Sequence, residues 1–336
     1  MKFKQYNKLT PYIKRHMLTL IPFLTVSKTL NILIALFEMK TRRTKVFSRP
    51  FVLRIDPCTL CNLKCVSCNT HKVQTSEKRM MSYDDFVVIV NKVKKYSIRC
   101  SLYDLGEPFL NKDIYKMIYF LSSNGISSLV STNFTLFKKG DLAELFNSRL
   151  TLLEPCMDGF TQENYVKYRV GGNIEDIKEN IKNVMEYKLK NNLKYPIVDV
   201  QVIEFEHLKE ELPLIDNFLK SIKVDRITYR KEHLGFNSVY RKDAPNSATC
   251  FWLYLGALIR PDGKVYPCGR NFDHFSYGNI FEQDIDEIWN NKYYQFSRSL
   301  FKKGPDLAYS EDMKDIPCLS CRRFIKQRKI YAIQQR

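Results

Sequence analysis

Three cysteines stand close together early in the chain, with the spacing C-x3-C-x2-C: Cys61, Cys65 and Cys68. Three thiolates on one short loop can each bind one iron of a [4Fe–4S] cubane, which normally takes four cysteine ligands. The fourth iron then stays open to an exogenous ligand, and an open coordination site makes a metal centre catalytic. Cys58 would close the cluster as a fourth ligand, so we interpret it as a non-ligand.

Zinc is the alternative for this first group, with His71 as a candidate fourth ligand. Zinc ribbons and fingers usually combine two C-x2-C pairs, or place histidines at a set distance from the cysteines. The observed spacing, directly after a β-rich segment, favours the iron–sulfur cluster.

Four further cysteines form a second group in the C-terminal third: Cys250, Cys268, Cys318 and Cys321. The residues before Cys268 read as a β-hairpin with its turn at Asp262-Gly263. Four thiolates are the full ligand set of one closed [4Fe–4S] cluster. The spacing also permits a structural zinc ion with four cysteine ligands.

Short β-rich segments alternate with helical segments after Pro50, and the first cysteine loop follows the first of them. We expect six strands, over residues 51–56, 98–105, 126–131, 150–157, 197–203 and 224–229. This alternation predicts an α/β fold, a partial (β/α)6 barrel of parallel strands. In such folds the chemistry lies at the carboxyl ends of the strands.

Three regions follow from this pattern. Residues 1–50 are expected to be a basic N-terminal extension with a partly amphipathic helix. Residues 51–235 are expected to form the partial barrel, and residues 236–336 a module that carries the second cysteine group.

The positive charge of the chain is concentrated at its two ends. The net charge is +18; residues 1–50 hold eleven Lys/Arg and one acid, and residues 322–336 hold six Lys/Arg and no acid. A nucleic-acid-binding protein would spread a basic patch over its folded body, so we expect no specific nucleic-acid partner. Basic ends suit contact with an anionic membrane surface, or are two solvated tails.

The cysteine pattern also indicates a compartment. Most of the ten cysteines stand in tight groups within a long, lysine-rich chain, unlike a secreted disulfide scaffold. We therefore expect reduced thiols in the cytoplasm, at a membrane surface if the N-terminal region binds one, and we expect no signal peptide.

The apolar run over residues 17–37 is long enough to suggest a membrane span, but Pro22, Lys28 and Asn31 interrupt it. A lysine near the bilayer centre costs about 2.5–3.5 kcal/mol on insertion scales. We expect a helix that lies in a membrane interface. The alternative is a helix that packs on the domain behind it.

The segment Pro57–Cys65 resembles the signature loop of the radical S-adenosylmethionine (radical SAM) superfamily. Further family landmarks follow in order at 106–108 (Gly-Glu-Pro), 131–133 (Ser-Thr-Asn), 156–159 (Cys-Met-Asp-Gly) and 168–172 (Tyr-Arg-Val-Gly-Gly). The resemblance implies that S-adenosylmethionine chelates the open iron. It implies Glu107 as the partner of the ammonium group, and Asn133, Asp158 and Arg169 as candidates for the ribose and carboxylate.

The second cysteine group resembles the auxiliary-cluster extension called SPASM, in its shortened twitch form with one cluster. The resemblance implies two [4Fe–4S] clusters, an external one-electron donor such as flavodoxin or ferredoxin, and a 5′-deoxyadenosyl radical that abstracts hydrogen. We expect an oxidoreductase that oxidises an alcohol C–H of a carbohydrate or aminocyclitol through the auxiliary cluster.

Three alternatives stay open. The first is an epimerase in which Cys156 returns hydrogen to the substrate, since this residue lies near the end of a predicted strand. The purely structural interpretation of Cys156 is a small buried core residue. The second is a peptide maturase. The third is a non-enzymatic protein with two zinc sites.

Overall fold

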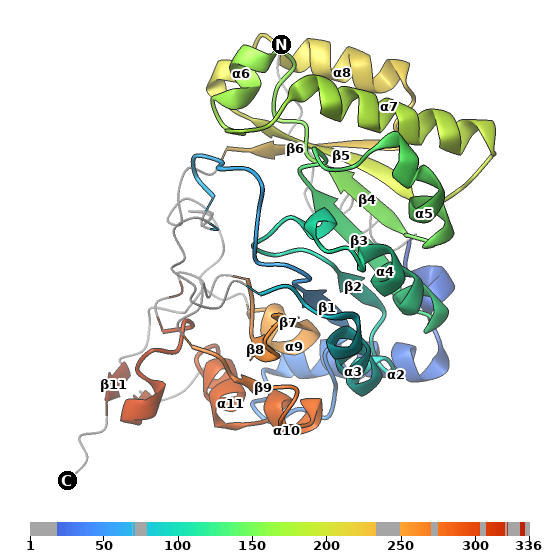
Figure 1. Cartoon of the computed structure of the whole chain (residues 1–336). Coiled ribbons are helices and arrows are strands. Elements are labelled where there is room, and N and C mark those ends of the chain that lie inside the picture. The colour runs from blue at the N-terminus through green and yellow to red at the C-terminus, as the bar shows by residue number, and fades with distance from the viewer. Residues whose placement is uncertain are drawn as a thin grey trace.

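The computed structural model describes residues 19–68, 70, 79–232, 249–269, 275–302, 307–319, 321 and 330–332. His71, the first eighteen residues and most of the basic C-terminal segment lie outside this part. A mainly parallel sheet forms the centre of the molecule, and helices α3, α4, α5, α7 and α8 follow one side of it (Figure 1). None of the helices within these ranges is long and apolar enough to cross a bilayer.

The main sheet has nine strands in the order β6-β5-β4-β3-β2-β1-β7-β8-β9, and it is not closed into a barrel. Its strands are β1 (Val52–Ile55), β2 (Arg99–Ser101), β3 (Ser127–Thr132), β4 (Leu152–Pro155), β5 (Ile197–Glu204), β6 (Arg226–Lys231), β7 (Gly256–Ile259), β8 (Lys264–Tyr266) and β9 (Gly278–Asn279). Strands β1 to β6 pair in parallel with their neighbours in sequence, which confirms the predicted parallel βα series. A separate parallel pair joins β10 (Leu307–Tyr309) and β11 (Ile330–Ala332).

The helices connect these strands. They are α2 (Val26–Thr41), α3 (Tyr83–Val93), α4 (Ile114–Ser123), α5 (Leu142–Asn147), α6 (Gln162–Val166), α7 (Ile174–Lys190), α8 (Leu212–Ser221), α9 (Trp252–Leu255), α10 (Ile285–Trp289) and α11 (Lys292–Ser299). Short 3-10 turns occur at Ile21–Phe23, Pro108–Leu110, Lys139–Asp141, Glu206–Leu208 and Glu311–Met313.

Local sequence explains where the helices begin. The Ser82 hydroxyl accepts a hydrogen bond from the Asp85 backbone N–H at 3.1 Å and caps α3. Asn173 caps α7 in the same way through the Glu175 N–H. Acidic residues in the first turn of both helices favourably oppose the helix dipole.

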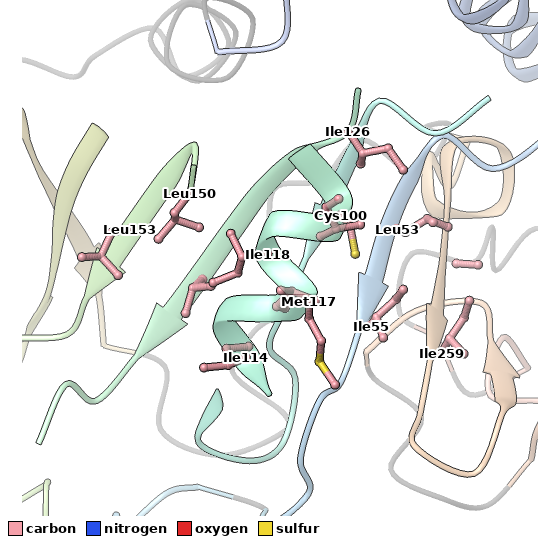
Figure 2. Close-up of a cluster of buried hydrophobic side chains, with 14 of the residues drawn as sticks. Leu53, Ile55, Cys100, Ile114, Met117, Ile118, Ile126, Leu150, Leu153 and Ile259 are labelled. Carbon is pink, nitrogen blue, oxygen red and sulfur yellow. The ribbon is translucent and has the colours of Figure 1, made fainter. Parts of the chain in front are cut away.

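The core lies between the helices and the sheet. Ile114, Met117 and Ile118 of α4 are fully or almost fully buried and pack toward the neighbouring strands (Figure 2). Every residue of β4 is buried, as expected for a parallel strand covered on both faces. This packing fixes the strands, and with them the loops at their carboxyl ends.

The C-terminal part joins the same sheet. Strand β7 pairs in parallel with β1, from Val52 opposite Gly256 to Ile55 opposite Ile259. The predicted hairpin at Asp262-Gly263 is present, because β7 and β8 are antiparallel and Gly263 has φ +79°. The sequence pattern indicated a separate module here; the structure adds that its first strand extends the core sheet, so that its loops begin beside β1.

Helix α2 packs on the amino ends of the strands through its polar side chains. The Lys28 ammonium donates to the Gly125 carbonyl, just before β3, at 2.5 Å. The Asn31 side chain exchanges two hydrogen bonds with the Arg49 backbone, just before β1. The Glu38 carboxylate accepts hydrogen bonds from the backbone of residues 47 and 48 and from the Ser48 hydroxyl. The helix therefore has one fixed side toward the protein.

Candidate functional site

The first cysteine loop directly follows β1 and is held by the segment that follows α6. The Lys64 N–H donates to the Val170 carbonyl at 2.9 Å, and the Val66 N–H donates to the Tyr168 carbonyl at 3.1 Å. These bonds explain why residues 168–172 are part of the predicted set of motifs: their backbone fixes the shape of the cysteine loop.

The loop after β2 packs tightly against the same cysteine loop at Gly106. A Cβ atom built on Gly106 would lie 1.9 Å from the Cys58 carbonyl oxygen and 2.5 Å from that of Leu60. The neighbouring Glu107 N–H donates to the Leu60 carbonyl at 2.7 Å. Only glycine permits this approach, which brings Glu107 beside the cysteines.

The three predicted cluster thiols lie among polar partners. The Arg169 guanidinium is 3.7 Å from Cys65 Sγ, and the Asn133 amide nitrogen is 3.8 Å from Cys61 Sγ. Burial, with smaller contributions from the neighbouring Glu107, Cys65 and Cys68, raises the pKa of Cys61 to about 11. Thiols that influence one another in this way would ionise together only beside a compensating positive charge, such as that of iron.

Glu107 is a buried carboxylate at the carboxyl end of β2. It accepts hydrogen bonds from the Thr132 hydroxyl at 2.6 Å, the Asn133 N–H at 2.8 Å and the Phe109 N–H at 3.1 Å. Burial raises its pKa in spite of these donors. A buried carboxylate gains most from an approaching cation, which suits the ammonium group that the resemblance assigns to it.

Asn133 links the ends of β2 and β3 to the cysteine loop. Besides its backbone bond to Glu107, its side-chain amide donates to the Asn62 side chain at 2.9 Å and its carbonyl accepts from Thr135. The residue therefore lies at the predicted site.

Asp158 and Arg169 form a buried ion pair. Two guanidinium nitrogens of Arg169 approach one Asp158 oxygen at 2.5 and 2.7 Å, and the other oxygen accepts from the Ile203 N–H at 2.7 Å. Asp158 is completely buried, with both oxygens in use. This geometry indicates that Asp158 positions Arg169 against Cys65, which the sequence alone could not distinguish from direct contact with the ribose.

Cys156 directly follows β4 and forms an isolated parallel bridge with Gln201 of β5. Its sulfur lies 3.8 Å from the Gln201 amide nitrogen and 4.0 Å from the Ser131 hydroxyl. The Gln201 carbonyl oxygen in turn accepts from Arg230 at 2.5 Å. Burial raises the pKa of Cys156 to about 11, so this thiol keeps its hydrogen at neutral pH. Sequence reasoning missed Gln201 and Arg230, since both lie within strands and carry no motif.

The four cysteines of the second group come together from three segments. Cys250 precedes α9, Cys268 follows β8, and the other two flank a turn in which the Cys321 N–H donates to the Cys318 carbonyl at 3.3 Å. Burial raises the pKa of Cys318, and the neighbouring Cys268, Cys250 and Cys321 raise it further. The described structure thus places all four predicted residues within electrostatic reach of one another.

Tyr277 is a neighbour of this group that sequence reasoning did not find. Its buried hydroxyl is 3.7 Å from Cys318 Sγ and 2.6 Å from the Ser297 hydroxyl. A tyrosine hydroxyl can donate a hydrogen bond to a ligand sulfur, which tunes a cluster through its surroundings.

A buried charge network connects the two cysteine groups. Asp104, after β2, forms ion pairs with Arg54 of β1 at 3.1 Å and with Arg260, after β7, at 3.6 Å. A Cβ atom on Gly269 would lie 2.6 Å from Arg54 Nη1 and 2.7 Å from Asp104 Oδ1. The Cys268-Gly269 turn therefore packs against the carboxyl ends of β1 and β2, where the first cysteine loop also begins.

The donor sets fit iron–sulfur clusters. Both are composed of thiols, which iron–sulfur clusters take as ligands, and both lie beside groups that can compensate or hydrogen-bond sulfur.

Comparison with known proteins identifies both parts of the chain. A family model described as the radical SAM superfamily matches residues 55–212. A second, described as the SPASM iron–sulfur cluster-binding domain, matches residues 250–322.

Relatives by sequence include the tungsten-containing aldehyde ferredoxin oxidoreductase cofactor-modifying protein of Pyrococcus furiosus. It is 23% identical over 300 residues, covering 74% of this chain and 83% of the relative. A probable GTP 3′,8-cyclase of Methanococcus maripaludis is 27% identical over 175 residues, covering 52% of this chain. The match covers 56% of the cyclase, so the chain spans about half the length of that relative.

Solved structures with the same fold include anSMEcpe with bound AdoMet, with a TM-score of 0.57 and 17% identity over 82% of this chain and 88% of that one. BtrN in complex with AdoMet and 2-DOIA has a TM-score of 0.50 and 16% identity, over 76% and 88% of the two chains. Likeness at these identities concerns the fold alone. The two family models together match more than half of the chain, and they show that it belongs to the radical SAM superfamily and carries a SPASM-type domain in its C-terminal part.

Proposed function

We propose that this protein is a radical SAM oxidoreductase that oxidises an alcohol group of a carbohydrate or aminocyclitol to a carbonyl. The observation that supports this proposal is the placement of Cys268. Its turn packs on Arg54 and Asp104, at the carboxyl ends of β1 and β2, so Cys268 lies at the end of the sheet where the first cysteine loop begins. An electron acceptor has to lie beside the substrate, and this arrangement meets that need.

Membership of the superfamily implies a [4Fe–4S] cluster and S-adenosylmethionine, and the SPASM domain implies further iron–sulfur binding. We assign Cys61, Cys65 and Cys68 to the first cluster and Cys250, Cys268, Cys318 and Cys321 to one auxiliary cluster. When bound, these groups supply a radical that removes a hydrogen atom and an acceptor for the electron that remains.

The protein's own residues then bind and orient the cofactor. Glu107 would accept the ammonium group of S-adenosylmethionine, and Asn133 would hold the end of β3 against the cysteine loop. Arg169, fixed by Asp158, would place a positive charge beside Cys65. An external one-electron donor such as flavodoxin or ferredoxin completes the proposal, with the cytoplasm as the compartment.

A second candidate is an epimerase, and the environment of Cys156 favours it. A hydrogen donor must keep its S–H at neutral pH, and burial raises the pKa of this thiol to about 11. The thiol also directly follows β4, at the same carboxyl end of the parallel strands as the first cysteine loop. The two reactions differ in the mass of the product, because oxidation removes two hydrogen atoms and epimerisation removes none.

The test is anaerobic incubation of the reconstituted protein with a panel of sugar and aminocyclitol alcohols, with 5′-deoxyadenosine and products measured by mass spectrometry. A product lighter by two hydrogen atoms supports the oxidoreductase. A product that has the mass of the substrate in ordinary water, and that gains one deuterium when the reaction runs in heavy water, supports the epimerase. If no alcohol stimulates 5′-deoxyadenosine formation and a peptide does, both proposals are wrong.

Cys156→Ala distinguishes the two candidates, with Cys100→Ala as the matched control because Cys100 is also buried and lies within the neighbouring part of the sheet, in β2. For an oxidoreductase, we expect Cys156→Ala to keep product formation within about threefold of the Cys100→Ala variant. For an epimerase, we expect 5′-deoxyadenosine still to form, while the rate of formation of the epimerised product falls by about a hundredfold or more.

Iron content tests the assignment of the two cysteine groups. Two cubanes give about eight irons per chain, so Cys250→Ala should lower the iron content by about half while leaving the first cluster able to bind S-adenosylmethionine. Cys58→Ala is the control and should keep all the iron, because we interpret Cys58 as a non-ligand. A colourless protein that holds two zinc ions would contradict the assignment.

A further inference from the structure

Helix α2 has the opposite orientation to an ordinary surface helix. Its polar residues Lys28, Asn31 and Glu38 are all less than 5% exposed, because they anchor the helix to the protein. Its large apolar residues point away: Leu30 is 54% exposed, and Leu33 and Phe37 are each 57% exposed. A surface helix of a globular protein normally buries its apolar side.

The anchors described above keep the helix from turning its apolar side inward. Each one is a hydrogen-bonded buried polar group, which would be costly to leave without its partner. The Lys28 bond reaches the loop before β3, and the Asn31 and Glu38 bonds hold the chain between α2 and β1. Rotation of the helix by half a turn would break all of these bonds at once.

Further exposed apolar residues precede and follow the helix in the chain. We call these residues, together with the exposed side of the helix, the α2 outer face. Its large apolar side chains are each at least 41% exposed: Ile21, Leu24, Val26, Leu30, Leu33, Ile34, Leu36, Phe37 and Phe47. Between Leu33, Ile34, Phe37 and Phe47 it forms a shallow groove of about 420 Å³. Exposed apolar patches of this kind mark binding surfaces.

The exposed charges of the segment that carries the α2 outer face, residues 19–50, have one sign. Within residues 19–50, all described in the structure, the acid is Glu38, and it is buried. Lys40, Arg43 and Lys45 are exposed, and the Arg43 guanidinium carbon lies 5.9 Å from the ring centres of both Phe37 and Phe47. The eighteen preceding residues add five further Lys/Arg and no acid.

We propose that the α2 outer face binds the surface of an anionic phospholipid bilayer, with α2 lying parallel to it. Apolar side chains flanked by exposed cations suit the boundary between acyl chains and negatively charged head groups. A second copy of the chain would bring two positively charged surfaces together, which is unfavourable. Nucleic acid would satisfy the cations and leave the apolar side chains in water.

Vesicle co-sedimentation of the full-length protein tests this proposal without any measurement of catalysis. We expect binding to vesicles of phosphatidylcholine with phosphatidylglycerol, and little binding to phosphatidylcholine alone. Leu33→Glu combined with Phe37→Glu should weaken the partition onto the anionic vesicles by about tenfold or more, because each change puts a charge on the apolar face.

Leu189→Glu on α7 is the matched control, because Leu189 is 53% exposed and lies on another helix. This variant should bind vesicles like the unchanged protein. Circular dichroism and iron content should be the same in all variants, since the substituted side chains are exposed. Vesicle binding and catalysis are thus measured separately. A failure to bind vesicles would leave the proposed reaction untouched, and a failure of the proposed reaction would leave the membrane proposal untouched.

Three results would overturn the proposal. The first is equal binding by the double variant and the unchanged protein. The second is that the unchanged protein is a dimer and the double variant is a monomer, because a second copy of the chain would then cover the α2 outer face. The third is loss of binding on deletion of residues 2–18 together with full binding by the double variant, which would assign the contact to the basic N-terminal segment.

Discussion

Arg169 connects three parts of the candidate site through one side chain. It forms the ion pair with Asp158, approaches Cys65 Sγ at 3.7 Å and lies 5.1 Å from the Tyr168 ring centre. The Coulomb attraction of Asp158 opposes the cost of burying the guanidinium, and the pKa of Arg169 is raised. The Arg169 guanidinium therefore stays positively charged beside the cysteine loop.

We predict that Arg169→Met lowers the free energy of unfolding by about 3–5 kcal/mol, because it leaves the Asp158 carboxylate buried without its partner. Denaturant unfolding measures this loss. The double variant with Asp158→Asn should recover part of it, and Lys167→Met, at an exposed position, should change stability by less than about 0.5 kcal/mol. Equal effects of Arg169→Met and Lys167→Met would show that the ion pair is energetically irrelevant.

At this scale the sequence predicted which residues meet, but not how they interact. The motif order brought Glu107, Asn133, Asp158 and Arg169 to one end of the sheet, because carboxyl ends of parallel strands share an edge. The pairing of Asp158 with Arg169 depends on side-chain directions that no spacing specifies. Tyr277 and Gln201 were missed because a lone tyrosine or glutamine within a strand or loop carries no pattern.

The cysteine loop owes its shape to two neighbouring elements, the loop after β2 and the segment after α6. The first approaches so closely that Gly106 has no room for a side chain. The second provides two backbone carbonyl oxygens that accept hydrogen bonds from the loop. Backbone contacts with both neighbouring elements therefore help to hold the loop in shape.

We predict that Gly106→Ala displaces the cysteine loop, because the added Cβ would meet the Cys58 carbonyl oxygen at 1.9 Å. The expected cost is about 2 kcal/mol or more in stability, together with loss of iron from the first site. Gly140→Ala is the control, since nothing lies within 4 Å of its Cβ position, and it should be neutral or slightly stabilising. Full iron content in Gly106→Ala would contradict the prediction.

Alternation of strands and helices was enough to predict β1 to β6 and their parallel order. It could not predict that β7 would pair with β1, since an edge strand can accept any compatible partner. Nor could it choose which side of α2 faces the protein: an apolar stripe normally faces inward, and three polar anchors reverse that preference here.

Across the whole molecule, the sheet and one buried charge network hold the two cysteine groups together. Arg54, Asp104 and Arg260 come from three different strands or their ends, and Asp56 lies beside them at the end of β1. Burial, together with the neighbouring Asp104, raises the pKa of Asp56 to about 8. The network is therefore sensitive to pH.

The direction of this pH dependence follows from proton binding. An unfolded aspartate releases its proton near pH 3.9, whereas folded Asp56 keeps it up to about pH 8. Between these values the folded state binds more protons, so stability falls as pH rises through this range. We predict that Asp56→Asn removes this contribution. Denaturant unfolding at about pH 5 and about pH 8 should show the unchanged protein losing stability relative to the variant. Parallel pH profiles would contradict the prediction.

The position of α2 at the amino ends of the strands has a consequence for how cofactor, electron donor and substrate reach the candidate site. The first cysteine loop lies at the other end of the sheet, where it follows β1. A bilayer held by α2 would leave that end facing the aqueous phase, so nucleoside cofactor and redox donor could enter and leave without crossing lipid. A substrate carried on a lipid tail would have to bend back over the rim of the protein, which favours substrates delivered from solution.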